Sequence, residues 1–215
     1  MKKLFPLVLA FLLVSMVASA QSPVPAKAAV YSSKAYFAIT YGWALPQGNF
    51  ASVEPPAAGF ANHGSQFTVQ GGITPAKNFA LELDYFYARY GIKNDAVSGT
   101  GLFLDNWKYS GFTFGPAIKI PMGKRFEANI KVKAGVAWVK SAVPNNNSNV
   151  ISDVKASTFI LKPGIDLRYH INPRVFIIGN LDWAYISPKF KYSDGNDLDQ
   201  LISALHLGFG FGVTF

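Results

Sequence analysis

The last fifteen residues, 201–215, read LISALHLGFGFGVTF, and side chains of the same kind recur at every second position. Successive side chains of a β-strand point to opposite faces of the sheet, so this stretch predicts a strand with two different faces. One face is bulky and apolar, and it carries Leu201, Leu205, Leu207, Phe209, Phe211, Val213 and Phe215. The other face is small or polar, and it carries Ala204, His206, Gly208, Gly210, Gly212 and Thr214.

The glycine-rich face decides which side of this strand points inward. A small soluble barrel would place the bulky face inside, and the glycine face would then cover its surface. With the opposite polarity, the bulky face meets lipid, and the small and polar groups face a narrow lumen. Alternation of apolar-out and polar-in residues is typical of strands in a transmembrane β-barrel.

The first twenty residues have the three parts of a secretory signal peptide. Lys2 and Lys3 form a basic start, residues 4–17 are an apolar run, and residues 18–20 read ASA. The alternative is an uncleaved anchor, but the apolar run is short for a spanning helix. We therefore predict a cleavable signal peptide over residues 1–20. A periplasmic tail is expected over residues 21–33, and a barrel domain over residues 34–215.

The composition excludes several classes of protein. The 215-residue chain has a formal net charge of +8, and the positive residues are spread without a basic block, which disfavours nucleic acid as a partner. The chain has no cysteine, so a disulfide scaffold and a thiolate metal site are both excluded. Aromatic residues make up 15% of the chain, which suits a barrel with aromatic girdles.

Alternating segments recur along the whole of the predicted barrel domain. They predict an all-β fold, an eight-stranded antiparallel up-and-down transmembrane barrel with strands over 34–45, 65–74, 79–90, 106–120, 125–139, 156–171, 174–187 and 201–215. Tight turns near Ala76, Gly123 and Asn172 alternate with longer loops over 46–64, 91–105, 140–155 and 188–199. Short periplasmic turns and longer outer loops are the expected asymmetry, so both termini should be periplasmic.

Two prolines fall inside these strands. Pro116 and Pro163 each remove a backbone donor from a sheet. We interpret both as local irregularities of the ladder.

Tryptophan and tyrosine residues gather toward one end of the predicted strands. With the first strand running outward, all four tryptophans fall at the outer rim, as an interfacial belt requires. The predicted aromatic girdle consists of Trp43, Tyr85, Tyr87, Trp107, Trp138, Trp183 and Tyr185. Trp107 has the wrong parity for the lipid-facing side of its strand, which indicates a bulge or a loop position there.

The chain resembles the eight-stranded outer-membrane barrels of Gram-negative bacteria, the OmpA-like and Opa-like transmembrane domains. The resemblance rests on the ASA site, the eight alternating segments, the three tight turns and the final GFGFGVTF. It implies a monomer in the cell envelope that contacts outer-membrane lipid and lipopolysaccharide. It also implies that Phe211, Val213 and Phe215 form a signal read by the outer-membrane assembly machinery.

Charged residues alternate onto the lumen side of the predicted strands. The expected lumen charge network is Glu82, Asp84, Lys119, Arg125, Glu127, Lys131, Lys133, Lys162, Asp166, Arg168, Asp182 and His206. An eight-stranded barrel has room only for its own side chains, and buried charges must pair. We therefore expect a plugged lumen. The alternative is a small porin-like channel or transporter, in which the basic excess would favour anions.

A third possibility implied by the resemblance is a lipid A-modifying hydrolase. Ser203 and His206 are close in sequence, but His206 has lumen parity and no acid shares its face at the membrane. The three carboxylates within residues 193–199 do not follow the EF-hand spacing. We expect no catalytic residue, cofactor or metal site. The predicted role is structural or surface-interacting, with any extracellular ligand bound through the outer loops.

Overall fold

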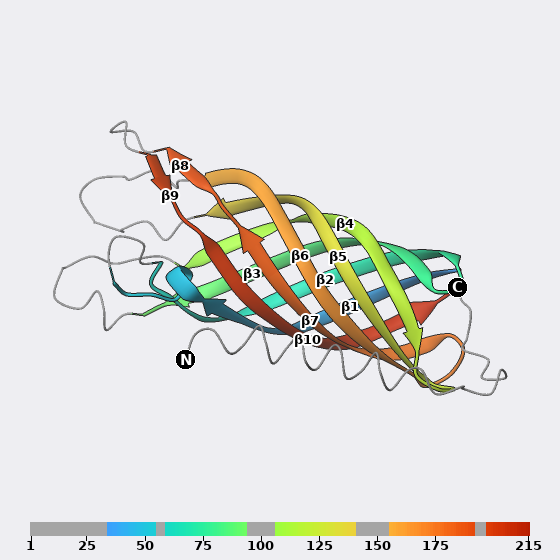
Figure 1. Ribbon diagram of the computed structural model, residues 1–215. Coiled ribbons are helices and arrows are strands. Elements are labelled where there is room, and N and C mark those ends of the chain that lie inside the picture. The colour runs from blue at the N-terminus through green and yellow to red at the C-terminus, as the bar shows by residue number, and fades with distance from the viewer. Residues whose placement is uncertain (1–33, 55–58, 94–105, 141–154, 192–196) are drawn as a thin grey trace, which may run out of the picture.

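The structure is a computed structural model that describes residues 34–54, 59–93, 106–140, 155–191 and 197–215. Eight long antiparallel strands close into a barrel in the order β1-β10-β7-β6-β5-β4-β3-β2 (Figure 1). The strands are β1 Ala35–Gln47, β2 Ala61–Ala76, β3 Phe79–Ile92, β4 Trp107–Pro121, β5 Phe126–Lys140, β6 Lys155–His170, β7 Val175–Ile186 and β10 Ile202–Thr214. The predicted eight-stranded antiparallel barrel is confirmed.

The segment predicted as a first long loop is shorter than expected. β1 extends to Gln47 and β2 starts at Ala61, and the connection contains a short 3-10 helix, η1 Gly48–Phe50. The predicted loop over 188–199 was wrong in part, because β8 Lys189–Lys191 and β9 Asp197–Asp199 pair as a small extra sheet. Strands of three residues are too short to show an alternating pattern in the sequence.

Several predictions fall on parts of the chain that the structure does not describe. The predicted signal peptide and periplasmic tail, residues 1–33, lie outside the described residues. So do residues 55–58, 94–105, 141–154 and 192–196 of the predicted outer loops.

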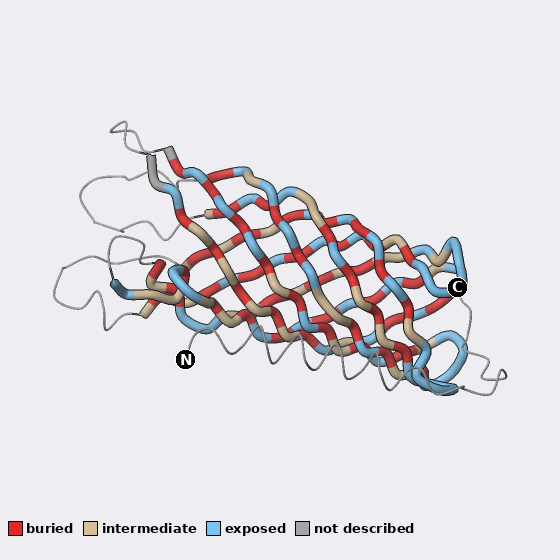
Figure 2. Tube along the Cα trace, viewed as in Figure 1, coloured by how far each residue is buried: buried red, intermediate tan, exposed pale blue. Residues whose placement is uncertain are grey.

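Buried residues alternate with more exposed ones along β1, β3, β4 and β10 (Figure 2). On the closing strand, Phe209 and Phe211 are 55% and 68% exposed, whereas Gly208 and Gly212 point into the barrel. A side chain at Gly212 would place its Cβ 2.1 Å from the ring of Phe176. Bulk therefore faces outward, and the glycines of β10 leave room for large side chains that other strands send into the lumen.

The barrel is closed by its first and last strands. β1 pairs with β10 over twelve residues, from Tyr36 opposite Thr214 to Gln47 opposite Ser203. Beyond the ladder, the Phe215 amide donates to the Ala35 carbonyl at 2.9 Å. Closure removes the two free edges, and this lets every strand pair on both sides, as a span across hydrocarbon requires.

The two prolines interrupt the ladder without shifting it. Between β4 and β5 the pairing stops after Phe114 and resumes at Ala117, with the register unchanged around Pro116. Between β6 and β7 the same gap surrounds Pro163, between Leu161 and Gly164. Proline has no N–H to donate, so a local gap in the ladder is the expected consequence.

The two ends of the barrel differ. The turns after β2, β4 and β6 and the C-terminus lie at one end, whereas η1, β8 and β9 lie at the other (Figure 1). We call these the turn end and the loop end. Among the described residues, no helix is long and apolar enough to cross a membrane.

A closed barrel of this kind should resist SDS at room temperature, because all its strands are paired on both sides. We expect an unboiled, membrane-extracted sample to migrate differently from a boiled one on the same gel. Equal migration of the two samples, together with recovery in the soluble fraction, would contradict the barrel.

Candidate functional site

The barrel lumen contains most of the buried charge of the described residues. It has five cations and five carboxylates, all at most 6% exposed: Lys119, Lys131, Lys133, Lys162, Arg168, Glu82, Asp84, Glu127, Asp166 and Asp182. Arg125, predicted to join them, lies exposed just before β5, and its Nη1 donates to the Tyr169 hydroxyl at 3.2 Å. Because Arg125 is the last residue of the turn, strand parity does not direct its side chain into the lumen. Without Arg125, the ten lumen charges balance.

The ten charges form one continuous chain in which the sign alternates at every step. Each neighbouring pair meets within salt-bridge distance, in the order Asp166, Lys131, Asp182, Lys162, Asp84, Lys133, Glu82, Arg168, Glu127 and Lys119. We call this set the lumen chain. Strand register alone does not bring all of these charged residues together, because several of the contacts cross the lumen.

Lysines link the carboxylates in the first part of the lumen chain. Lys131 Nζ contacts Asp166 and lies 3.0 Å from Asp182 Oδ1. Lys162 Nζ lies 3.3 Å from Asp182 Oδ2 and 3.7 Å from Asp84 Oδ2. Lys133 continues the chain with Nζ 2.5 Å from Asp84 Oδ2. Every one of these lysines therefore has at least one buried carboxylate as its counter-ion.

Arg168 links the residues of the second part of the lumen chain and also contacts Asp166, the first member of the chain. Its Nη2 lies 3.2 Å from Glu82 Oε1, and its Nη1 lies 3.5 Å from Glu127 Oε1. The same guanidinium approaches Asp166 at 3.5 Å, and Lys119 Nζ lies 3.3 Å from Glu127 Oε2. A planar guanidinium has five donors, and Arg168 uses them to contact three carboxylates, whereas each of the lysines Lys131, Lys133 and Lys162 contacts two.

Neutral side chains from β1 and β2 complete these contacts. The Tyr36 hydroxyl donates to Glu82 Oε1 at 2.5 Å, and the Arg168 guanidinium lies 3.9 Å from the Tyr36 ring centre. Gln70 Nε2 donates to Glu82 Oε2 at 2.7 Å and to Asp166 Oδ2 at 3.0 Å. Neither residue was predicted as part of the lumen charge network, although the parity of both places them in the lumen.

The salt bridges of the lumen chain all come from one side of the barrel. Its ten members lie on β3, β4, β5, β6 and β7. Within the described ranges, no salt bridge of the lumen includes a residue of β1, β2 or β10. These three strands contribute neutral groups to the lumen instead.

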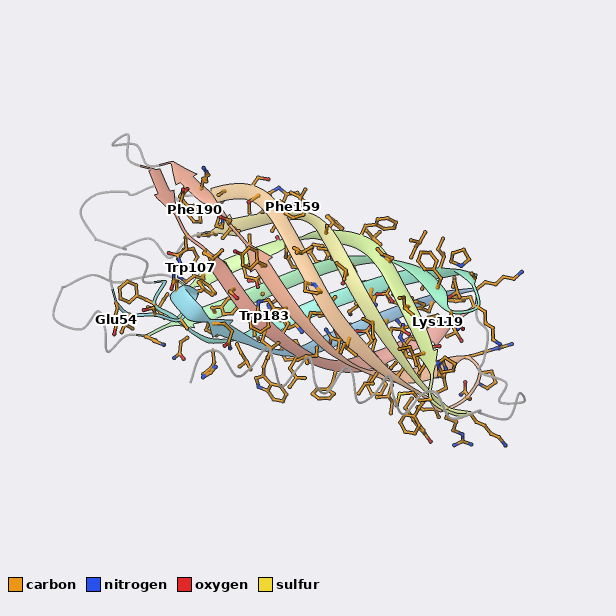
Figure 3. All side chains as sticks on the ribbon, in the orientation of Figure 1. Glu54, Trp107, Lys119, Phe159, Trp183 and Phe190 are labelled. Carbon is orange, nitrogen blue, oxygen red and sulfur yellow. The ribbon has the colours of Figure 1, made fainter. Side chains whose placement is uncertain are left out.

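An apolar cluster fills the lumen at the loop end. Phe50 of η1 packs edge-on against Tyr90 and Trp107, with ring centres 5.0 and 5.6 Å apart, and Phe190 of β8 lies 5.9 Å from Trp107. Phe50, Tyr90 and Phe190 are fully buried. We call these four rings the outer plug; Figure 3 shows Trp107 and Phe190 at the loop end and Lys119 toward the turn end.

Trp107 therefore does not belong to the aromatic girdle, although it was predicted from the sequence to be a girdle residue. The side chain is 5% exposed, and its Nε1 donates to the Gly59 carbonyl at 2.8 Å. No bulge rotates it outward: β4 starts at Trp107 and stays in register with Tyr90 of β3. From the first residue of the strand, Trp107 has the same parity as the lumen-facing residues of β4.

The other predicted girdle residues lie on the outer surface. Trp183 is partly exposed, and its Nε1 donates to Ser203 Oγ at 3.0 Å. The more exposed members, at 37–57%, are Trp43, Tyr85, Tyr87, Trp138 and Tyr185. The predicted assembly signal also faces outward, with Phe211, Val213 and Phe215 exposed.

His206 lies between the outer plug and the lumen chain. Its Nε2 lies 2.9 Å from the Tyr90 hydroxyl and 2.8 Å from the Tyr109 hydroxyl, and the two hydroxyls are 2.7 Å apart. Ser203 has the opposite parity and points to the outer surface, where Trp183 donates to it. The structure thus does not bring Ser203 and His206 together. The two tyrosines were not anticipated, although both have lumen parity.

Comparison with known proteins identifies the class that this fold defines. The family model of the outer membrane protein beta-barrel domain matches residues 8–215, so the chain belongs to that family of bacterial outer-membrane barrels. No curated protein sequence matches the chain.

Solved structures of outer-membrane barrels share the fold at low sequence identity. Neisserial surface protein A is 14% identical with a TM-score of 0.57, over 85% of this chain and 98% of that one. OprG from Pseudomonas aeruginosa is 16% identical with a TM-score of 0.57, over 86% and 99%. A major outer membrane protein from Thermus thermophilus is 13% identical with a TM-score of 0.52, over 84% and 99%.

Proposed function

We propose that this protein is a non-enzymatic outer-membrane barrel with a closed lumen, whose role is structural or depends on contacts made at its loop end. The observation that carries the proposal is the filling of the lumen in two layers. The lumen chain occupies one layer, and the outer plug occupies the other. A pathway for solutes would require both layers to move.

The balance of charge in the lumen argues against the anion channel considered from the sequence. That alternative depended on a basic excess, which disappears once Arg125 lies outside. Opening a path would also separate buried ion pairs, and removing one partner of such a pair costs about 3–5 kcal/mol. The closed lumen is therefore the state that the electrostatics of the lumen chain favour.

Planar-bilayer recordings test the closed lumen. We expect the refolded protein to give no discrete openings, while a general porin reconstituted in parallel shows that the bilayer reports conductance. Discrete openings that disappear on substitution of Lys131 or Lys162 would overturn the proposal in favour of a channel.

Whole-cell binding tests the interaction role. Cells that express the protein should bind a panel of immobilised surface proteins and glycans better than cells with an empty vector. Replacement of residues 141–154 by a short Gly/Ser linker should lower that binding while the gel shift is retained. Binding by expressing cells no better than by empty-vector cells would leave only the structural role.

A further inference from the structure

Four basic side chains form a row across four neighbouring strands near the loop end. Arg89 of β3 is opposite Lys108 of β4, Lys108 is opposite Lys140 of β5, and Lys140 is opposite Lys155 of β6. All four have the parity of the outer face, and each is exposed or half-buried. Residues directly opposite on paired strands have Cβ atoms about 4.5–5.5 Å apart. We call these four residues the basic row.

A second row lies directly below the basic row on the same face. It joins Tyr87, Ser110, Trp138 and Ser157 through the same strand pairings. Tyr87 and Trp138 are 38% and 48% exposed on the outer surface. Tryptophan and tyrosine mark the boundary between hydrocarbon and head groups in membrane proteins. The basic row, one step closer to the loop end, is therefore at the level of the lipid head groups.

The two rows enclose a hollow in the outer surface. It has a volume of about 380 Å³, and its lining includes the three lysines of the basic row and all four residues of the second row. None of its described lining residues is acidic. The hollow thus combines three ammonium groups on the side nearer the loop end with aromatic rings on the side nearer the middle of the barrel.

The basic row is confined to one side of the barrel. Beyond Arg89, the same row continues through Ser65 of β2 to Trp43 of β1 and Leu207 of β10, none of which is charged. Because the lumen charges balance, the positive excess of the described strands lies outside the lumen. Part of that excess is concentrated on the outer faces of β3 to β6.

We propose that the basic row and its hollow bind a phosphorylated glycolipid of the outer leaflet. The phosphate groups would accept charge-assisted hydrogen bonds from Arg89 and the three lysines. The apolar part of the lipid would contact Tyr87 and Trp138. The inference rests on the outward orientation of the loop end in the proposed function.

Lipid binding by substituted barrels tests the inference. The probe is bis-phosphorylated lipid A, added to the refolded protein and counted as bound copies by native mass spectrometry. Joint replacement Lys108→Gln, Lys140→Gln and Lys155→Gln should weaken binding by about tenfold or more, since each lysine near an anionic surface contributes separately. The corresponding Lys→Arg replacements should retain binding.

A matched variant controls for net charge. Lys77→Gln, Lys124→Gln and Arg174→Gln remove the same charge from exposed positions at the turn end, and binding should stay within about twofold of the unmodified protein because these positions lie at the opposite end of the barrel from the basic row. Dephosphorylated lipid A should bind as weakly to the unmodified protein as lipid A binds to the triple Gln variant. Equal losses in both charge variants, or full competition by inorganic phosphate, would overturn the site.

A separate measurement tests the orientation alone. The chain has no cysteine, so Val53→Cys in the exposed segment after η1 gives a single labelling position. A membrane-impermeant maleimide should label it on intact cells. Labelling only after lysis would overturn the outward loop end, whereas labelling on intact cells with unchanged lipid binding by the triple Gln variant would overturn the lipid site alone.

Discussion

Replacement of Lys131 by methionine will lower the free energy of unfolding by about 3–5 kcal/mol, because it leaves buried carboxylates without a counter-ion. Lys131 is 2% exposed and contacts both Asp166 and Asp182. Methionine keeps most of the volume, so the loss will come from charge more than from packing. Urea unfolding of the protein in lipid vesicles, followed by tryptophan fluorescence, measures the change.

Two further variants make the Lys131 result interpretable. Lys124→Met removes an exposed lysine in the turn before β5 and should change stability by less than about 0.5 kcal/mol. Lys131→Met combined with Asp182→Asn should recover part of the loss, because the second change removes one of the unpaired charges. A Lys131 variant as stable as the unmodified protein would show that the lumen chain is not formed.

Replacement of Phe50 by alanine will have the second large effect, a loss of about 3 kcal/mol or more, as expected for removal of a fully buried ring. Phe50 is the side chain by which η1 enters the lumen, and it contacts both Tyr90 and Trp107. The same unfolding measurement applies, and a fall in the SDS-resistant fraction on the gel should accompany it.

Val53→Ala provides the comparison for Phe50→Ala. Val53 lies three residues further along the same segment and is 42% exposed, so its truncation should change stability by less than about 0.5 kcal/mol. If both variants lose the same stability, the segment as a whole, and not the ring in the outer plug, is responsible.

Strand parity explains how much of this structure the sequence can predict. The two-residue period placed Phe209 and Phe211 on lipid and Gly208 in the lumen, and the strand ends fall close to the predicted ones. The same period correctly assigns Lys131 to the inside. Where a side chain follows a turn, as Arg125 does, parity gives no constraint, and the prediction was wrong.

The partners of the lumen charges could not be predicted in the same way. Strand register specifies only which residues are neighbours on adjacent strands. Lys133 of β5 instead meets Glu82 and Asp84 of β3, with β4 between them, and Lys162 of β6 also meets Asp84. Such contacts depend on how far each long side chain reaches across a curved wall. The outer plug was missed because Phe50 and Phe190 come from segments without a strand period.

The placement of every lumen salt bridge on β3 to β7 has a consequence for biogenesis. Strands β1 and β10 can pair last, because their pairing neither creates nor separates an ion pair among the described residues. All of the lumen ion pairs can therefore form within a five-strand intermediate, before the barrel closes around them. Sealing the cylinder then adds backbone hydrogen bonds and the neutral contacts of Tyr36, Gln70 and His206.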